Sequence, residues 1–363
     1  MRIILIAPFP PPITGQSLAV KVFHDALIRK HEVNVVNLSK NSLKNGVNSY
    51  SRIVQIFKIF KEVWVKSKFA DVIYFTISES IAGNLKDLII YLICYRSLHK
   101  MVIHLHGGSI RKLLFDKHKL LFIINCFFIR RLGSITVLGQ SHVGIFSDIV
   151  SGEKIQIVPN FAEDYIFIDE DGIINKFSSI TPLKILFLSN LIYGKGHNEL
   201  VEAFMALDDN LKQQITIDFA GSFESESQKE EFLKRIKIHQ QIHYHDVVVG
   251  AEKSNLLSGA HLLCLPTCLS EGQPISILEA YASGCVVMTT NQGGICDIFK
   301  DKINGFEIQK KSADSIKAVI EQIIKAPEQL LPLAMTNRKI ADAKYRTSNY
   351  SASLLKIIEG VSV

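Results

Sequence analysis

Two stretches decide the fold: RIILIAPFPPPITGQS at residues 2–17 and LKILFLSNLIYGKGH at residues 183–197. Each is a run of aliphatic and β-branched residues, then a loop that carries glycine, then the start of a helical pattern. An uninterrupted apolar run is typical of a strand that is buried on both faces of a parallel sheet. Glycine in such a loop lets a ligand approach the backbone, and the helix start offers free N–H groups to an anion. The sequence therefore predicts two sheets that begin alike.

Further strands and helices follow in each half. The expected strands are HEVNVVNL, DVIYFTI, KMVIHLH, SITVLG and KIQIVPN in the first half, and QITIDFAG, HDVVVG, AHLLCLP and CVVMTT in the second. Strands that alternate with helices indicate an α/β protein with parallel sheets. We expect two doubly wound Rossmann-like domains, at residues 1–165 and 182–340, joined by a linker at 166–181. Residues 341–363 are expected to form a C-terminal helix that packs back on the N-terminal domain.

Cysteine usage and hydropathy limit the class of protein. The 363 residues contain six cysteines, mostly inside apolar runs, and no CxxC pair. This usage favours reduced thiols in a cytosolic protein over a disulfide framework or a zinc site. The apolar run at the N-terminus is interpreted as a first strand, because it is short and proline follows it at once. No run approaches the ~18 apolar residues that a membrane span needs. A cytoplasmic location is therefore expected.

The segment SEGQPISILEAYASG, residues 270–284, places two carboxylates around a helix start. Pro274 suits the first helical turn, and Gly284 is expected to end the helix. Glu271 lies in the preceding turn, where it can accept hydrogen bonds from sugar hydroxyls or balance a positive charge. Glu279 lies inside the helix, and its carboxylate can accept two hydrogen bonds from a diol. The alternative is a helix-terminal acid followed by an exposed mid-helix glutamate.

The wider segment EGQPISILEAYASGCVVMTTNQGGICDIF resembles the signature of family 4 retaining glycosyltransferases, which have the two-domain GT-B fold. The shared features are a Glu-x7-Glu motif, a small-residue helix end, a Val-Val strand and a Gly-Gly turn. The resemblance extends over nearly the whole chain in the same order, including IVPN at residues 157–160 and the Lys195-Gly196 pair. It implies two domains that face a cleft, and transfer of a sugar from a nucleotide-sugar donor.

The resemblance also implies roles for individual residues. Glu279 would bind the donor ribose, and Glu271 with the backbone amides that follow it would hold the donor sugar and phosphate. Lys195 would neutralise the diphosphate leaving group. The remaining implied positions are Gly15 near the phosphates, His106 near the donor sugar, and Asn190, Gly272, Gln273, Pro274 and Ile275 as further donor contacts, with Glu271, His106 and Lys195 as the catalytic group.

One departure concerns the phosphate site. The family usually has an arginine ahead of its lysine, and this chain has Ser189 and Asn190 there. A retaining transfer needs charge stabilisation of the departing diphosphate, with Glu271 as an electrostatic stabiliser and a phosphate oxygen as the acceptor of the proton. A double displacement with two carboxylates is the other route to retention, and the sequence leaves it open.

Metal and cofactor chemistry are not expected. His104 and His106 alternate along one strand, as do His243 and His245, but no third ligand has suitable spacing and no Asp-x-Asp motif is present. Strand histidines are more often packed or hydrogen-bonded than metal-bound. The resemblance also points to a metal-independent reaction, in which the nucleotide-sugar is a substrate.

The charge distribution suggests an anionic partner. Lys and Arg exceed Asp and Glu by ten in residues 1–165, whereas residues 166–363 carry a net charge of −4. The segment RKLLFDKHKLLFIINCFFIRR, residues 111–131, has an apolar middle that is expected to be buried and basic ends that are expected to meet anionic lipid head groups. Those basic residues are Arg111, Lys112, Lys117, Lys119, Arg130 and Arg131.

These features favour a glycosyltransferase that acts on a lipid-linked saccharide in surface polysaccharide biosynthesis, such as O-antigen or capsule, at the inner face of the cell membrane. UDP-sugars are the first expectation for the donor and GDP-sugars the second. A sugar-nucleotide epimerase of the same fold is the alternative enzyme. A nucleic-acid-binding protein is the alternative from another class, and no recognition helix or aromatic RNA-binding motif supports it.

Overall fold

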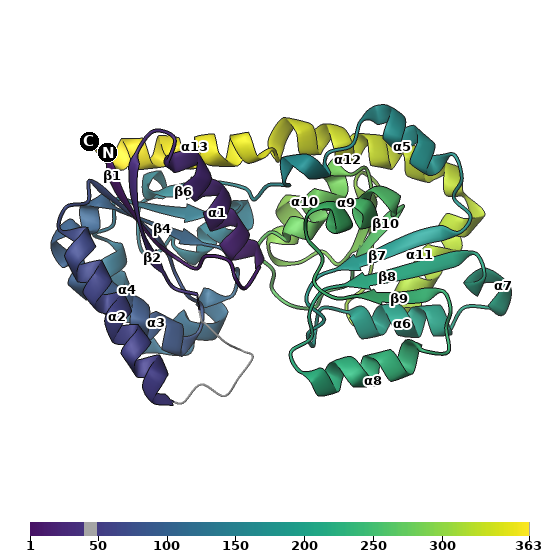
Figure 1. The fold of residues 1–363 in the computed structure, drawn as a ribbon, viewed down its shortest axis with the longest axis horizontal. Helices are drawn as coiled ribbons and strands as arrows, with labels where there is room; N and C mark the ends of the chain where they lie inside the picture. The colour runs from purple at the N-terminus through teal and green to yellow at the C-terminus, as the bar shows by residue number, and fades with distance from the viewer. Residues whose placement is uncertain (40–48, 363) are drawn as a thin grey trace. The chain divides into compact units, whose positions relative to one another are not determined.

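The computed structural model describes residues 1–39 and 49–362. The described chain divides into two compact units, each built on a parallel six-stranded sheet (Figure 1). Unit 1 consists of residues 1–160, 270–273 and 347–363. Unit 2 consists of residues 161–269 and 274–346.

The sheet of unit 1 has the strand order β2-β1-β3-β4-β5-β6. Helices α2, α3 and α4 pack one against the next, while α1 packs on α13, which also contacts β3 and β4 (Figure 1). Because helices cover both faces, the central strands are buried along nearly their whole length, and Ile3 to Ala7 are all buried. The elements are β1 (Arg2–Ala7), α1 (Gly15–Leu27), β2 (Glu32–Asn37), α2 (Ser49–Ser67), β3 (Val72–Thr76), α3 (Ile81–Ile93), β4 (Met101–Leu105), α4 (Lys119–Ile129), β5 (Ser134–Val137), β6 (Ile155–Ile157) and α13 (Thr347–Val361).

The sheet of unit 2 has the strand order β12-β11-β10-β7-β8-β9, the order of a Rossmann sheet. Its core is continuous through the strands and the helices that cover them. The elements are α5 (Glu170–Phe177), β7 (Leu183–Leu188), α6 (His197–Met205), α7 (Asp209–Lys212), β8 (Ile215–Ala220), α8 (Glu226–Ile236), β9 (Ile242–His245), α9 (Gly250–Gly259), β10 (Leu262–Leu265), α10 (Ile275–Ala282), β11 (Val286–Thr289), β12 (Gly305–Glu307), α11 (Ala313–Lys325) and α12 (Leu330–Lys344).

The expected linker at residues 166–181 contains a helix instead. Asp169 caps α5 by accepting a hydrogen bond from the Gly172 N–H at 2.8 Å. Ile173 and Phe177, four residues apart, are buried in the core of unit 2. Gly284 lies just after α10 with φ of +64°, and a side chain there would collide with Ile173. The helix end at Gly284 was predicted correctly, and the linker prediction was wrong because α5 buries an apolar face.

Two other predicted elements differ from the structure. The expected strand HDVVVG lies mostly beyond β9, which spans Ile242–His245, and its last residue begins α9. The C-terminal helix expected at residues 341–363 is interrupted at Tyr345: its first residues end α12, and α13 begins at Thr347. The carbonyl of Tyr345 accepts a hydrogen bond from the Ala162 N–H at 2.8 Å, and this contact draws the backbone away from the helix. Strand β12 was not predicted.

His261 links three elements in the core of unit 2. Its Nδ1 accepts a hydrogen bond from the Lys184 N–H at 3.0 Å, and its Nε2 donates to the carbonyl of Lys176 at 3.1 Å. The ring is buried, and burial lowers the pKa of His261 to about 4. The folded protein therefore holds His261 as a neutral imidazole, since a proton on Nδ1 would break the bond from Lys184.

Low pH should reduce the stability of unit 2 because His261 becomes protonated. Its folded pKa is below the unfolded value, so the stability it supports is present above about pH 6.5 and is lost as the pH falls toward 4. We expect the loss to reach about 1.4 kcal/mol per pH unit within that window. Thermal unfolding at pH 7.5 and pH 5 should show a smaller acid-induced drop for His261→Gln than for the wild type. The exposed His243→Gln is the matched control, and an equal drop in all three proteins would contradict the assignment.

Candidate functional site

The carboxyl edge of the unit 2 sheet brings two loops together. Strand β7 lies between β8 and β10, so the connections that leave β7 and β10 diverge at this edge. Such a topological switch point is where open α/β sheets bind ligands. The loop after β7 carries Asn190 and Lys195, and the loop after β10 leads into α10. The two loops are adjacent because β7 and β10 pair in parallel.

Lys195 is held between two glycines with left-handed backbone. Gly194 and Gly196 have φ of +89° and +90°. The carbonyl of Gly194 accepts a hydrogen bond from the Cys268 N–H at 2.7 Å, and a Cβ on Gly196 would lie 2.4 Å from the carbonyl oxygen of Pro266. Lys195 is half-buried just before the N-terminus of α6. Lys195 and the partial positive charge of the helix start therefore lie at the same edge.

Asn190 lies at the position where the resembling family has its arginine. Its side-chain oxygen accepts a hydrogen bond from the Ser222 hydroxyl at 3.1 Å. The neighbouring Ser189 carbonyl lies against Gly221, where a Cβ would come within 2.0 Å of the oxygen. Asn190 thus joins the loops after β7 and β8, and it brings no positive charge to the edge of the sheet.

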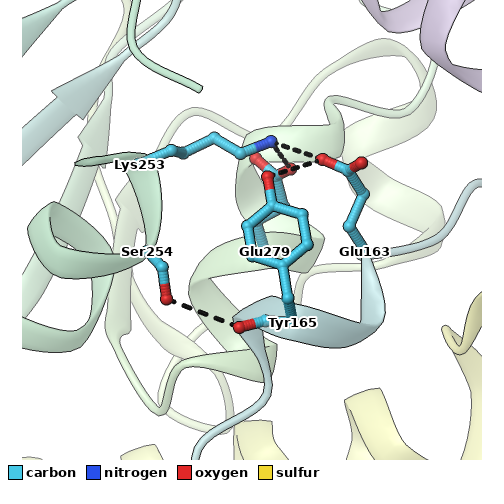
Figure 2. A network of polar contacts seen from close by, with 5 residues as sticks. All are labelled: Glu163, Tyr165, Lys253, Ser254 and Glu279. Carbon is cyan, nitrogen blue, oxygen red and sulfur yellow. Dashed lines mark hydrogen bonds and ion pairs between the residues drawn. The ribbon is translucent and has the colours of Figure 1, made fainter. Parts of the chain in front are cut away.

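Glu279 belongs to a buried ion-pair cluster in unit 2, together with Lys253 and Glu163 (Figure 2). The Lys253 ammonium donates to Glu279 Oε1 at 2.6 Å and to Glu163 Oε2 at 2.8 Å. Only 3% of Glu279 is exposed, and Lys253 is also buried. The alternative interpretation, an exposed mid-helix glutamate, is therefore wrong. Burial lowers the pKa of Lys253, but the two carboxylates outweigh burial and raise it, so Lys253 stays protonated.

A second layer fixes Glu163 (Figure 2). The Tyr165 hydroxyl donates to Glu163 Oε2 at 2.9 Å, and the Ser254 hydroxyl donates to the Tyr165 carbonyl at 3.4 Å. Lys253 and Ser254 are neighbours on α9, so this helix is tied to the segment around Glu163 at two points. Lys253 and Glu163 were not predicted as site residues, because 90 residues separate them and neither lies in a motif.

Residues 270–273 belong with unit 1, unlike α10 that follows them. A Cβ on Gly272 would lie 2.2 Å from the carbonyl oxygen of His106, so only glycine fits there. Gln273 is buried, and two hydrogen bonds join it to Asn160. Its side-chain oxygen accepts from the Asn160 backbone N–H at 3.0 Å, and its backbone carbonyl accepts from the Asn160 side-chain amide at 2.8 Å. The motif residues Gly272 and Gln273 therefore contact the loop of His106 and the IVPN segment, respectively. The side chain of Gln273 acts as a structural bridge.

The switch point of unit 1 lies between β1 and β3. Gly15 is the first residue of α1 and is exposed, after Thr14, which forms a capping box with Ser17. Pro274 caps α10 and Ile275 is its first residue. Gly15 and Ile275 therefore lie at helix N-termini, as their expected contact with anionic groups requires.

Glu79, which the sequence analysis did not single out, lies in the loop after β3. Its Oε1 accepts hydrogen bonds from the N–H groups of Ser109 and Ile110, the latter at 2.8 Å. A side chain at Gly107 would collide with the Glu79 carboxylate. Burial raises the pKa of Glu79, and the two N–H donors oppose that rise. Glu79 thus fixes the HGGS loop that carries His106, and no pattern in its own segment indicates that role.

In the two histidine pairs, His104, His106 and His245 are packed or hydrogen-bonded. His104 and His106 stack with ring centroids 4.0 Å apart, and His104 Nδ1 lies 2.6 Å from the Tyr74 hydroxyl. Burial lowers the pKa of His106 to about 3. His245 Nε2 lies 2.8 Å from Asp218, while His243 is exposed. Across residues 1–39 and 49–362, no group of three or more His, Cys, Asp or Glu side chains is arranged to hold a metal ion.

The whole chain has the fold of known solved structures. It superimposes on Anabaena HepE, solved in complex with UDP and glucose, with a TM-score of 0.75, 14% identity and 99% coverage of both chains. It also superimposes on WaaG, a glycosyltransferase involved in lipopolysaccharide biosynthesis, with a TM-score of 0.71, 15% identity and 98% coverage of both chains. The predicted two-domain α/β fold of the GT-B type is confirmed.

Sequence comparison gives the class of enzyme. The chain is 26% identical over 140 residues to MJ1607 of Methanocaldococcus jannaschii, an uncharacterized glycosyltransferase, and the match covers 39% of this chain and 35% of that protein. The match therefore spans about a third of the length of that curated relative. Residues 172–340 match the family model for glycosyl transferases group 1. These residues are similar to glycosyl transferases of group 1, and this similarity supports the predicted glycosyltransferase-type enzyme.

Proposed function

We propose that this protein is a retaining glycosyltransferase of the family 4 type that transfers a sugar from a nucleoside-diphosphate sugar. The observation that carries the proposal is the carboxyl edge of the unit 2 sheet. There the Lys195 loop lies beside the loop that leads to α10, and α10 carries the buried Glu279. An ammonium with a helix N-terminus suits a diphosphate, and a carboxylate suits the ribose diol. UDP is the first candidate, supported by the UDP complex of HepE, and GDP is the second.

The charges of the chain suit a metal-independent transfer. As the bond from the anomeric carbon to the diphosphate breaks, negative charge grows on the leaving oxygen, and Lys195 stabilises it. Glu271 stabilises the positive charge that develops on the sugar. The acceptor oxygen forms the new bond on the same face, and its proton passes to the departing phosphate oxygen. His106, held neutral by burial, offers hydrogen bonding to the donor sugar without a competing charge.

The acceptor in this proposal is a lipid-linked saccharide of a surface polysaccharide such as O-antigen or capsule. The fold likeness to WaaG, which is involved in lipopolysaccharide biosynthesis, supports this class. The basic first half of the chain suits an anionic membrane, so the proposed location is cytoplasmic and peripheral to the inner face of the cell membrane. In the described ranges, no helix combines the length and apolarity of a membrane span.

An epimerase of the same fold is the competing enzyme. It would release the nucleotide and an altered sugar without an acceptor. Free nucleoside diphosphate that appears only when a saccharide acceptor is added would support the transferase, and equal release without an acceptor would support the epimerase. A nucleic-acid partner has no support from the described residues beyond their net positive charge.

A nucleotide screen tests the donor site. Thermal unfolding is measured with UDP, GDP, dTDP, CDP and NAD, each with and without EDTA. A ligand at about a hundred times its dissociation constant should add ~2.7 kcal/mol to the free energy of unfolding. We expect one diphosphate, UDP first, to stabilise the wild type regardless of EDTA, and Glu279→Gln to lose most of that gain. If no nucleotide stabilises the wild type, the donor-site assignment is wrong.

Lys195 should contribute to nucleotide affinity only through its contact with the phosphates. We expect Lys195→Met to weaken UDP binding about tenfold or more and to leave uridine binding unchanged, because only the diphosphate meets the ammonium. Calorimetric titration of both ligands gives the two constants. Lys212→Met, a surface lysine of unit 2 that pairs with Asp209, is the matched control. Equal weakening of UDP and uridine by Lys195→Met would contradict this role.

A further inference from the structure

Helices α3 and α4 of unit 1 are fixed side by side by a buried pair of amides. The Asn84 amide donates to Asn125 Oδ1 at 3.0 Å, and the Asn125 amide donates to Asn84 Oδ1 at 3.0 Å. The Asn125 amide also donates to the Leu121 carbonyl at 2.8 Å. Because both amides are buried and paired, the two helices have a fixed register, and their outer faces form one surface.

The outer face of this helix pair is apolar and exposed. On α3 the exposed side chains are spaced by four, four and three residues, and on α4 by three and four, so each set lies along one side of its helix. Tyr95 stacks on Phe127 with ring centroids 6.1 Å apart and joins the two rows. The α3–α4 face comprises Ile81, Leu85, Ile89, Leu92 and Tyr95 with Leu120, Ile123 and Phe127, whose exposed fractions run from 42% for Ile89 to 71% for Leu120.

This exposure corrects the interpretation of residues 111–131. The apolar middle was expected to be buried, but only one side of α4 is buried, with Asn125, Cys126, Phe128 and Ile129. Arg111 was expected to meet lipid, but its guanidinium makes two hydrogen bonds of 2.7 Å to Asp148. The apolar residues Leu120, Ile123 and Phe127 of α4 are therefore on the surface and not in the core.

Basic side chains border the α3–α4 face. Lys119, Arg130 and Arg131 are exposed at the two ends of α4, and the Arg131 guanidinium lies 3.9 Å from the centre of the Phe127 ring. Of the acids nearby, Asp87 is paired with Lys86 at 2.8 Å. Asp116 and Asp148 share Arg111, at 3.6 and 2.7 Å. The border therefore has an excess of positive charge.

We propose that the α3–α4 face is the surface through which unit 1 binds an anionic phospholipid bilayer. Exposed aliphatic and aromatic side chains bounded by Lys and Arg match a membrane interface, where apolar groups enter the acyl region and cations meet phosphates. A second copy of the chain fits less well, because a face-to-face pair would bring Arg130, Arg131 and Lys119 against their own counterparts. Membrane binding by this face is tied to the proposed function at one point: a lipid-linked acceptor would lie in the same membrane.

Vesicle flotation of the full chain tests the proposal. The probes are vesicles of equal parts phosphatidylcholine and phosphatidylglycerol, and vesicles of phosphatidylcholine alone. We expect the wild type to bind the anionic vesicles, and L120S with I123S to bind them about tenfold or more weakly. Lys119→Gln and Arg130→Gln should each cost about fivefold on anionic vesicles and little on neutral ones.

The control is Ile238→Ser, which removes a 78% exposed isoleucine from unit 2 and should leave flotation unchanged. The thermal shift with UDP, measured without vesicles, should be the same in every variant, so failure of the donor site is recorded separately. The proposal is overturned if the wild type does not bind anionic vesicles or if L120S with I123S binds as the wild type does. It is also overturned if the wild type is a dimer that this double variant converts to a monomer.

Discussion

One buried ammonium, Lys253 between Glu163 and Glu279, holds the carboxylate on which the proposed nucleotide site depends. An ionised carboxylate inside a protein costs several kcal/mol unless a partner compensates it. Lys253 meets two carboxylates at 2.6 and 2.8 Å, so the two share one positive charge. Burial still raises the pKa of Glu279, and the ammonium opposes that rise. The contact joins α9, α10 and the segment before α5, and it keeps Glu279 in a single position. A carboxylate that is already positioned loses little entropy when it binds a diol.

The rest of the site follows from the topology of parallel sheets. In each unit the first strand is not at an edge, so neighbouring loops diverge at its carboxyl end. In unit 2 this gives the Lys195 loop and the start of α10 a common edge. In unit 1 the same topology places Gly15 and the loop of Glu79 at a common edge of the sheet. Glu79 in turn fixes the HGGS loop, residues 106–109. Rigid strands thus carry loops whose glycines allow close packing, as Gly196 and Gly272 do.

The sequence was sufficient for features that depend on local pattern. Uninterrupted apolar runs located most of the strands, and glycine located the end of α10. Local pattern failed where tertiary contacts decide. Residues 166–181 mix acidic and polar residues with aliphatic and aromatic ones, and Ile173 and Phe177 bury one face of α5. A strand was expected at HDVVVG, but the residues that pair with β8 are Ile242–His245, which form β9. Lys253 and Glu79 are single charged residues whose partners are distant in sequence, so no motif revealed them.

The most direct test of the account is a double-mutant cycle on nucleotide affinity. The diphosphate that stabilises the wild type is titrated by calorimetry into the wild type, Lys253→Met, Glu279→Gln and the double variant, with folding checked by circular dichroism. If Lys253 acts through Glu279, each single change weakens binding and the double variant is no weaker than Glu279→Gln, with a coupling energy of about 1 kcal/mol or more. If the two effects simply add, or if Lys253→Met binds the nucleotide as the wild type does, then Lys253 does not position Glu279 for the donor.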